Sequence, residues 1–144
     1  MEITKSDIGV GIKTDIGLEI RELRKERGLS QIVLDESAGV TKSVVSKIES
    51  AQETAKYNGA YYRASKYLYL KIFMVLKLPL NQMEELIQLA NVYFGSNNNE
   101  DIIIKKAIKS GEYNIWIVSD ELSKRGLKDV FLGSDIKERK SKKK

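Results

Sequence analysis

The chain has 144 residues, with 25 Lys and Arg against 20 Asp and Glu, which gives a formal net charge of +5 and enough length to bury a core. It has no cysteine and no histidine, which excludes disulfides, thiolate and imidazole metal sites and a catalytic triad that needs an imidazole. No window approaches the roughly 18 apolar residues of a membrane span, and the N-terminus lacks a secretory pattern, so we expect a cytoplasmic protein without a membrane partner or cofactor.

The N-terminal region contains an arm followed by a helix. Residues 1–13 show no sustained periodicity and favour a flexible arm. From Thr14 or Asp15 to Arg27, apolar residues recur at helical spacing among charged ones. These apolar residues are Ile16, Ile20 and Leu23. The pattern predicts an amphipathic helix that ends at Gly28.

The next stretch, residues 30–49, predicts two short helices joined by a tight turn. Ser30 can accept from the free amides of a helix that begins at Gln31, and Gly39 readily adopts the left-handed conformation that ends it. Thr41 can cap the second helix. The apolar side of this second helix consists of Val44, Val45 and Ile48. Its polar side, which is free to contact a partner, consists of Lys42, Ser43, Ser46 and Lys47.

Further helices are predicted downstream of this stretch. Residues 60–77 contain no glycine or proline and become almost continuously apolar from Leu68, so we expect a long buried helix that Pro79 stops. Asn81 can then cap a helix that runs from Gln82 to about Val92.

A second, smaller helical unit follows a candidate linker at residues 93–99, which is rich in Gly, Ser and Asn. Residues 100–110 and 114–125 predict two helices within a C-terminal extension over 100–133. This hairpin buries little alone, so its apolar faces must pack on the preceding helices or on a second subunit. Trp116 lies off the main stripe and is either a partly buried anchor or an interface hot spot.

The positive charge is concentrated in a basic tail, residues 134–144. Six Lys and Arg residues against Glu138 over 137–144 give +5, which equals the excess of the whole chain. Residues 1–50 carry eight basic residues against nine acidic ones. The tail is therefore either a solvated end or a source of sequence-independent phosphate affinity.

The central stretch resembles the lambda-repressor-like helix-turn-helix family, the Xre/Cro group. Its residues at the family's pattern Q-x-x-L-A-x-x-x-G-V-[ST]-x-x-x-[IV]-S-x-x-E are Gln31, Leu34, Gly39, Val40, Thr41, Val45, Ser46 and Glu49. Residues 16–29 are similar to the family's first helix, and 70–78 to its helix after the motif. The resemblance implies an all-α fold, with a helix-turn-helix bundle over 14–92 and the helical hairpin as an extension.

Two positions depart from this family pattern. Asp35 stands where the family has a small alanine, so the helices must separate there or the carboxylate must have a partner. Ser50 and Ala51 replace the usual exit from the second helix. These departures concern how the motif docks on its target.

The resemblance also implies a function: sequence-specific binding of double-stranded DNA by a transcriptional regulator, most often a repressor, as a homodimer on a palindromic operator. The helix near Thr41–Glu49 would enter the major groove. The base-contact candidates are Lys42, Ser43, Val44 and Lys47, whose ammonium, hydroxyl and methyl groups suit base edges. The candidates for contacts with the DNA backbone are Gln31, Thr41, Ser46, Arg24 and Arg27.

Another function stays open because the motif region is near neutral. The chain could be a protein-interaction module, such as an antitoxin or an anti-repressor target, and a regulator could answer to a protein antagonist or an inducer. We do not expect an enzyme. The paired acids Asp35-Glu36, Glu84-Glu85 and Asp120-Glu121 are adjacent in sequence, so they point around a helix and not into one site.

Overall fold

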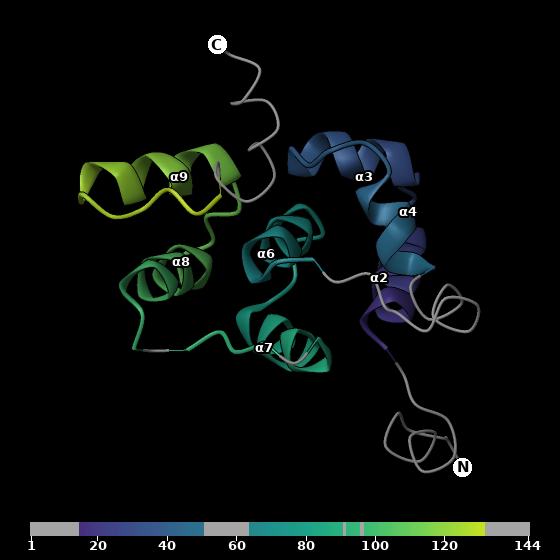
Figure 1. The fold of residues 1–144 in the computed structure, drawn as a ribbon, viewed down its shortest axis with the longest axis horizontal. Coiled ribbons are helices and arrows are strands. Elements are labelled where there is room, and N and C mark those ends of the chain that lie inside the picture. The colour runs from purple at the N-terminus through teal and green to yellow at the C-terminus, as the bar shows by residue number, and fades with distance from the viewer. Residues whose placement is uncertain (1–14, 51–63, 91, 96, 132–144) are drawn as a thin grey trace.

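The computed structural model describes residues 15–50, 64–90, 92–95 and 97–131, and these ranges contain seven α-helices and no strand (Figure 1). The helices are α2 (Ile16–Glu26), α3 (Gln31–Ala38), α4 (Val44–Glu49), α6 (Lys66–Val75), α7 (Leu80–Leu89), α8 (Asn99–Lys109) and α9 (Ile115–Lys124). The all-α class is confirmed. None of these seven helices is long and apolar enough to cross a bilayer. The predicted arm and basic tail lie outside the described residues.

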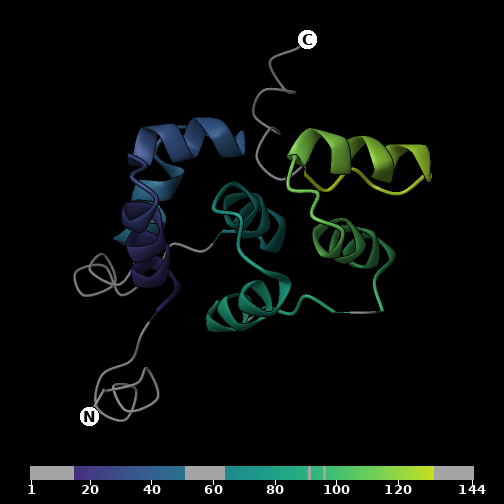
Figure 2. The same cartoon turned by 180° about the vertical axis from the view of Figure 1, so that it is seen from behind.

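The helices are arranged around a central pair. Figures 1 and 2 show α6 and α7 in the middle, with α2, α3 and α4 on one side and α8 and α9 on the other. Helix α6 packs against α3, and α7 contacts both α2 and α8. The C-terminal hairpin therefore packs on the preceding helices, which is one of the two arrangements that its sequence left open.

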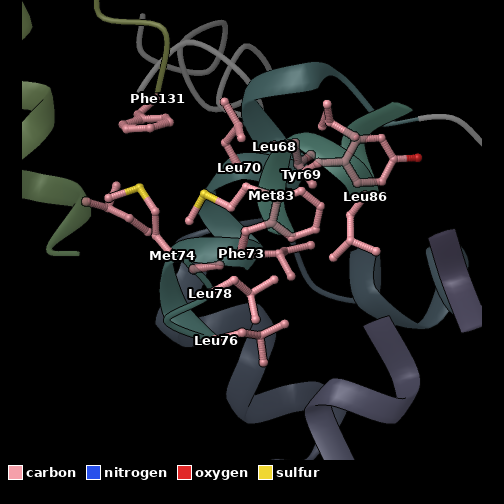
Figure 3. Packing of buried hydrophobic residues seen from close by; sticks show 14 of the residues in the cluster. Leu68, Tyr69, Leu70, Phe73, Met74, Leu76, Leu78, Met83, Leu86 and Phe131 are labelled. Atoms are coloured by element: carbon pink, nitrogen blue, oxygen red, sulfur yellow. The ribbon is translucent and has the colours of Figure 1, made fainter. Parts of the chain in front are cut away.

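Helix α6 forms the middle of the hydrophobic core. Every residue from Leu68 to Met74 is buried, which explains why this stretch of the sequence is almost continuously apolar. Figure 3 shows the side chains of α6 and α7 gathered together, with Phe131 of the C-terminal segment beside them. Fully burying one such Leu, Ile or Phe side chain contributes roughly 1.5 to 3 kcal/mol. The core is thus shared by segments from both ends of the described chain.

Helix α6 is shorter than the helix predicted at 60–77. It begins at Lys66, where the Ser65 hydroxyl accepts from the Leu68 amide, and it ends at Val75. Lys77 takes a left-handed conformation with φ of 56°, which turns the chain before Pro79 is reached. The prediction was wrong because apolar content continues past the helix end, and periodicity does not reveal such a turn. Residues 60–63 lie outside the described residues.

Helix α7 begins two residues earlier than predicted. Pro79, with φ of −67°, occupies the N-cap position that was predicted for Asn81, and the helix runs from Leu80 to Leu89. Proline is well suited to the start of a helix because its φ is already close to the helical value and it has no amide to leave unsatisfied. Pro79 therefore starts α7 and does not itself stop α6.

A buried carboxylate connects α6 and α8 through the predicted linker. Asp101 is 1% exposed and accepts from the Lys66 ammonium at 2.8 Å, the Tyr67 hydroxyl at 2.7 Å and the Gly95 amide at 3.1 Å. Phe94, next to that glycine, is buried in the core. The described part of the 93–99 stretch is therefore held to α8 by this hydrogen bond and to the core by Phe94.

Candidate nucleic-acid interface

Helix α3 begins and ends as its sequence predicts. The Ser30 hydroxyl accepts from the Val33 amide at 3.0 Å, which caps the first turn. Gly39 follows the last residue of the helix with φ of 67°, and its amide and that of Val40 donate back to carbonyls of α3. A left-handed residue at this position lets the chain reverse tightly toward α4.

Helix α4 begins at Val44, later than the sequence predicts. Its N-cap residue is Ser43, which lies in the left-handed region with φ of 76° and makes no side-chain cap. Thr41 does not cap α4; its carbonyl oxygen accepts from the Val44 amide at 3.2 Å within the turn. The prediction failed because the capping group comes from another helix.

That capping group is the carboxylate of Asp35. Its Oδ2 accepts from the Ser43 amide at 3.0 Å and its Oδ1 from the Val45 amide at 2.9 Å. Asp35 lies on α3 and is 3% exposed, so both oxygens are held away from water. The first amides of a helix have no intrahelical acceptor, and a carboxylate is favourable at this positive end of the helix dipole. Of the two alternatives that the sequence left open at position 35, the second therefore holds: the carboxylate has partners, and they are the first amides of α4.

The other end of α4 is held by a polar network centred on Glu49. Its carboxylate receives the Arg24 guanidinium through two hydrogen bonds, at 2.7 and 3.0 Å, and the Gln31 side-chain amide at 2.8 Å. Arg24 also donates to the Leu29 carbonyl oxygen at 2.8 Å. The hydrogen bond to Glu49 raises the pKa of Arg24, against the opposing effect of burial. This network ties α2, α3 and α4 together.

Helix α2 also lies very close to α4. Gly17 is buried at this crossing, and a Cβ atom there would collide with the backbone oxygen of Ile48. A glycine is therefore required for the two backbones to approach this closely. With the Asp35 cap and the Glu49 network, this contact fixes the position of α4 from three sides.

The arrangement of α2, α3 and α4 agrees with a comparison with known families. Residues 20–56 match the family model described as Helix-turn-helix. The chain contains a lambda-repressor-like helix-turn-helix. No curated protein and no solved structure matches the chain. The helix-turn-helix is the fold of DNA-binding transcription regulators, so the domain indicates a regulator of that kind.

In this helix-turn-helix, the predicted DNA-contact residues fall into two groups. Those at the surface are Thr41, Lys42, Ser43 and Lys47, with Gln31 and Ser46 partly exposed. The side-chain amide of Gln31 also donates a hydrogen bond to the Glu49 carboxylate. On the apolar side of α4, Val45 and Ile48 are buried as predicted, and Val44 is buried with them. The helix thus buries one side and leaves polar residues at the surface on the other.

Three of the predicted contacts need correction. Val44 is buried in the core, so its methyl groups do not reach the surface. Arg24 is 9% exposed and its guanidinium is committed to Glu49 and Leu29, which removes it from the phosphate-contact candidates. Arg27 is exposed as a residue, but its Nε donates to the Leu76 carbonyl oxygen at 2.6 Å and ties α2 to the end of α6.

Sequence reasoning also missed two groups that position the helix-turn-helix. Glu49 was recognised only as a family position, although a buried acid at the end of a helix calls for a basic partner. The second group is Lys71 of α6, which is 2% exposed. Its ammonium donates to the Phe131 carbonyl oxygen at 3.0 Å and to that of Gly39 at 3.5 Å. The turn of the motif is therefore joined to the C-terminal segment, and no signal in the sequence indicates that pairing.

Proposed function

We propose that the protein is a sequence-specific DNA-binding transcriptional repressor that inserts α4 into the major groove, as a homodimer on a palindromic operator. The supporting observation is the division of α4 into a buried side, Val44, Val45 and Ile48, and a surface side that carries Lys47, with Lys42 exposed in the turn before the helix. A short helix held rigidly by its inner side and offering donors on its outer side suits a groove.

We assign base contacts to Lys42, Ser43 and Lys47. A lysine ammonium can donate to the O6 and N7 acceptors of guanine, and a serine hydroxyl can both donate and accept. Contacts with the DNA backbone are assigned to Thr41, Ser46 and the start of α3 at Gln31, where helix amides favour a phosphate. Val44 and Arg24 belong to the frame that holds these residues.

The affinity has to come from few groups. The first 50 residues have eight basic and nine acidic residues, so the helix-turn-helix brings no general attraction to phosphate. A second copy on the other half-site doubles the placed contacts. The basic tail at 134–144 would add sequence-independent attraction. We therefore propose that residues 14–92 read the DNA, while the hairpin over 100–133 supports them and the tail strengthens binding.

The test starts with selection of bound duplexes from a random pool, followed by affinity measurements on the selected site and on random DNA. Lys42→Ala should reduce the discrimination between them by about 1 to 3 kcal/mol, because a base-edge donor is removed. Lys106→Ala, which removes an exposed lysine from α8, is the matched control and should leave discrimination unchanged. An equal loss on both DNAs for Lys42→Ala would contradict its base-reading role.

Two further measurements test the tail and the dimer. Deletion of residues 134–144 should weaken binding to every sequence and reduce the salt slope by about one for each phosphate that the tail neutralises. Light scattering with the selected duplex should give two chains on one palindrome. One chain on an asymmetric site would contradict the homodimer.

A protein-interaction module is the second candidate function, and one observation favours it. Trp116 and Ile117 at the start of α9 are 57% and 52% exposed, and the Trp116 ring lies against Gly39 in the turn of the motif. Exposed aromatic side chains are common at interfaces. A stable complex with another protein, formed by a chain that selects no DNA, would favour this function.

A further inference from the structure

The carboxylate of Asp35 occupies the start of α4 more completely than a surface cap would. Both of its oxygens accept from backbone amides of a helix other than its own, at Ser43 and Val45. The amide between them, that of Val44, is taken by the Thr41 carbonyl oxygen. These three consecutive amides are therefore engaged by groups of the protein itself, which leaves side chains to supply specificity at these positions.

We propose that Asp35 is a positioning residue that determines where the reading helix α4 begins, and thereby which side chains meet the base edges. This inference rests on the proposed DNA-binding function. An L-residue rarely adopts the left-handed conformation, yet Ser43 does so with φ of 76°. The bond from its amide to the Asp35 carboxylate holds it there. Without that acceptor, nothing in the contacts of the Ser43 amide favours the strained conformation.

The start of the helix matters because Lys42 and Ser43 precede it while Lys47 lies within it. In a continuous helix, residues five apart are turned by about 140° from each other. A helix that extended through Lys42 would therefore turn its ammonium away from the side that carries Lys47. With the helix beginning at Val44, Lys42 is free of that constraint. Asp35 thus sets the relation between the two lysines without itself reaching the surface.

Substitution of Asp35 by alanine would release the start of α4. It would leave the Ser43 and Val45 amides without their acceptor, and water or a rearranged turn would have to replace it. Asparagine keeps the shape of aspartate but has one oxygen and one amide group. It can serve only one of the two backbone donors, and its own N–H groups would face the other. Both substitutions act on the start of α4 and remove no surface side chain.

The experiment uses the full-length protein and the duplex that the wild type selects. Competition binding is measured for wild type, Asp35→Ala and Asp35→Asn on every single base-pair variant of that duplex. At the positions read by Lys42 and Ser43, we expect the ratio between the best and the worst base to fall about tenfold. Asp101→Asn is the matched control, because it also disrupts a buried acid but lies in α8. This control should lower stability and leave the ratio between the best and the worst base at these positions unchanged.

Amide hydrogen exchange gives a readout that needs no DNA. The Ser43 and Val45 amides should be protected in the wild type and should exchange faster in both Asp35 variants, while the Val33 amide, capped by Ser30, keeps its rate.

Each outcome decides between separate conclusions. A folded Asp35 variant that keeps the wild-type ratio between the best and the worst base at these positions overturns the positioning role, even if its affinity is lower. If Asp35→Ala does not fold, the result for Asp35→Asn decides by the same criterion. Rapid exchange of both amides in the wild type would also overturn the inference. A wild-type protein that selects no sequence refutes the proposed function instead, and it does so without reference to Asp35.

Discussion

The helix-turn-helix and the C-terminal half each contain a buried aspartate, and the two aspartates have different surroundings. Asp35 accepts from two backbone amides at the start of α4. Asp101 accepts from an ammonium and a hydroxyl of α6 and from an amide of the stretch that precedes α8. The first arrangement sets the local course of one helix, whereas the second ties distant parts of the chain together.

The difference follows from the sizes of the helices involved. Helix α4 has six residues and α3 has eight, whereas α6, α8 and α9 have ten or eleven. Short helices are marginal alone and bury little apolar area, so their orientation depends on a few specific contacts. In α4 these contacts are Asp35 at one end and Glu49 at the other. Helix α4 is therefore fixed by polar groups at its two ends in addition to its buried side, and the rest of the fold mainly by its core.

The largest effect should come from Glu49→Ala, which tests whether polar groups hold α4. The substitution leaves the buried Arg24 guanidinium without its carboxylate and removes the partner of Gln31. Breaking a buried pair by removing one member costs about 3 to 5 kcal/mol, because an unpaired charge remains buried. Urea denaturation followed by circular dichroism measures the change in the free energy of unfolding.

Glu121→Ala is the control for that measurement. Glu121 pairs with Arg125 one turn along α9, and both side chains are about half exposed to solvent. Exposed pairs of this kind contribute about 0.3 to 0.5 kcal/mol. If both substitutions reduced stability by the same small amount, the Glu49 network would not be what holds α4.

Asp101→Asn should have the next largest effect on stability. It should loosen the C-terminal half and leave the helix-turn-helix unchanged. It removes the negative charge that faces the Lys66 ammonium and one acceptor for the Tyr67 hydroxyl. We expect a loss of about 2 to 3 kcal/mol, since hydrogen bonds to charged groups are worth more than neutral ones. Hydrogen exchange should show faster opening of α8 with little change in α3. An equal rise in the exchange rates of α8 and α3 would contradict the view that Asp101 stabilises only the C-terminal half.

Three helices whose ends the sequence predicts well, α3, α8 and α9, have capping residues of their own. Ser30 and Gly39 give the limits of α3, and Asn98 and Asn114 cap α8 and α9. Each signal lies within a few residues of the end it determines, so it can be found by inspection. The buried side of α4 was predictable for the same reason, because periodicity alone indicates it.

The features that the sequence does not reveal depend on residues far apart in the chain. Helix α4 starts where it does because of Asp35 on another helix, and Arg24 is withdrawn from the surface by Glu49. Lys71 joins Gly39 to Phe131 across α6. In each case the side chain is chemically able to face solvent or DNA, and only tertiary packing decides that it does neither. The sequence therefore indicates the motif but does not reveal which of its polar side chains the fold withdraws from the surface.

Tyr67→Phe tests how much stability the Tyr67 hydroxyl contributes to the Asp101 cluster and how this contribution depends on pH. Burial, and then the hydrogen bond to Asp101, raise the pKa of Tyr67 well above its ordinary value. The stability that this hydroxyl contributes, about 1 to 2 kcal/mol, is therefore fully present below the unfolded pKa of about 10. It is lost as the pH rises further, since the unfolded state then releases its proton first.

The measurement is the difference in unfolding free energy between wild type and Tyr67→Phe, taken at neutral pH and at about pH 11. All other groups are common to both proteins, so the difference isolates Tyr67. We expect the wild type to be more stable at neutral pH and its advantage to shrink at the higher pH. A constant difference would mean that the pKa of Tyr67 is the same in the folded and unfolded chains.

The smallest change in stability should come from glycine substitutions at two residues in the left-handed conformation, one in each region. Ser43 and Lys77 both have positive φ, at 76° and 56°, and each strained position should be relieved by glycine. Glycine should remove about 1 to 2 kcal/mol of backbone strain. Its greater entropy in the unfolded chain offsets part of this, so the free energy of unfolding should rise by about 0.5 kcal/mol for either substitution.

The two glycine variants should then differ in one respect only. Ser43→Gly keeps the amide that donates to Asp35 but removes a hydroxyl that we assign to a base edge, whereas Lys77 lies in the turn between α6 and α7. Ser43→Gly should therefore lose discrimination among operator variants while gaining stability, and Lys77→Gly should gain stability with its discrimination intact. If Ser43→Gly were instead less stable than the wild type, the hydroxyl would have a structural role at the start of α4, and its assignment to base reading would have to be withdrawn.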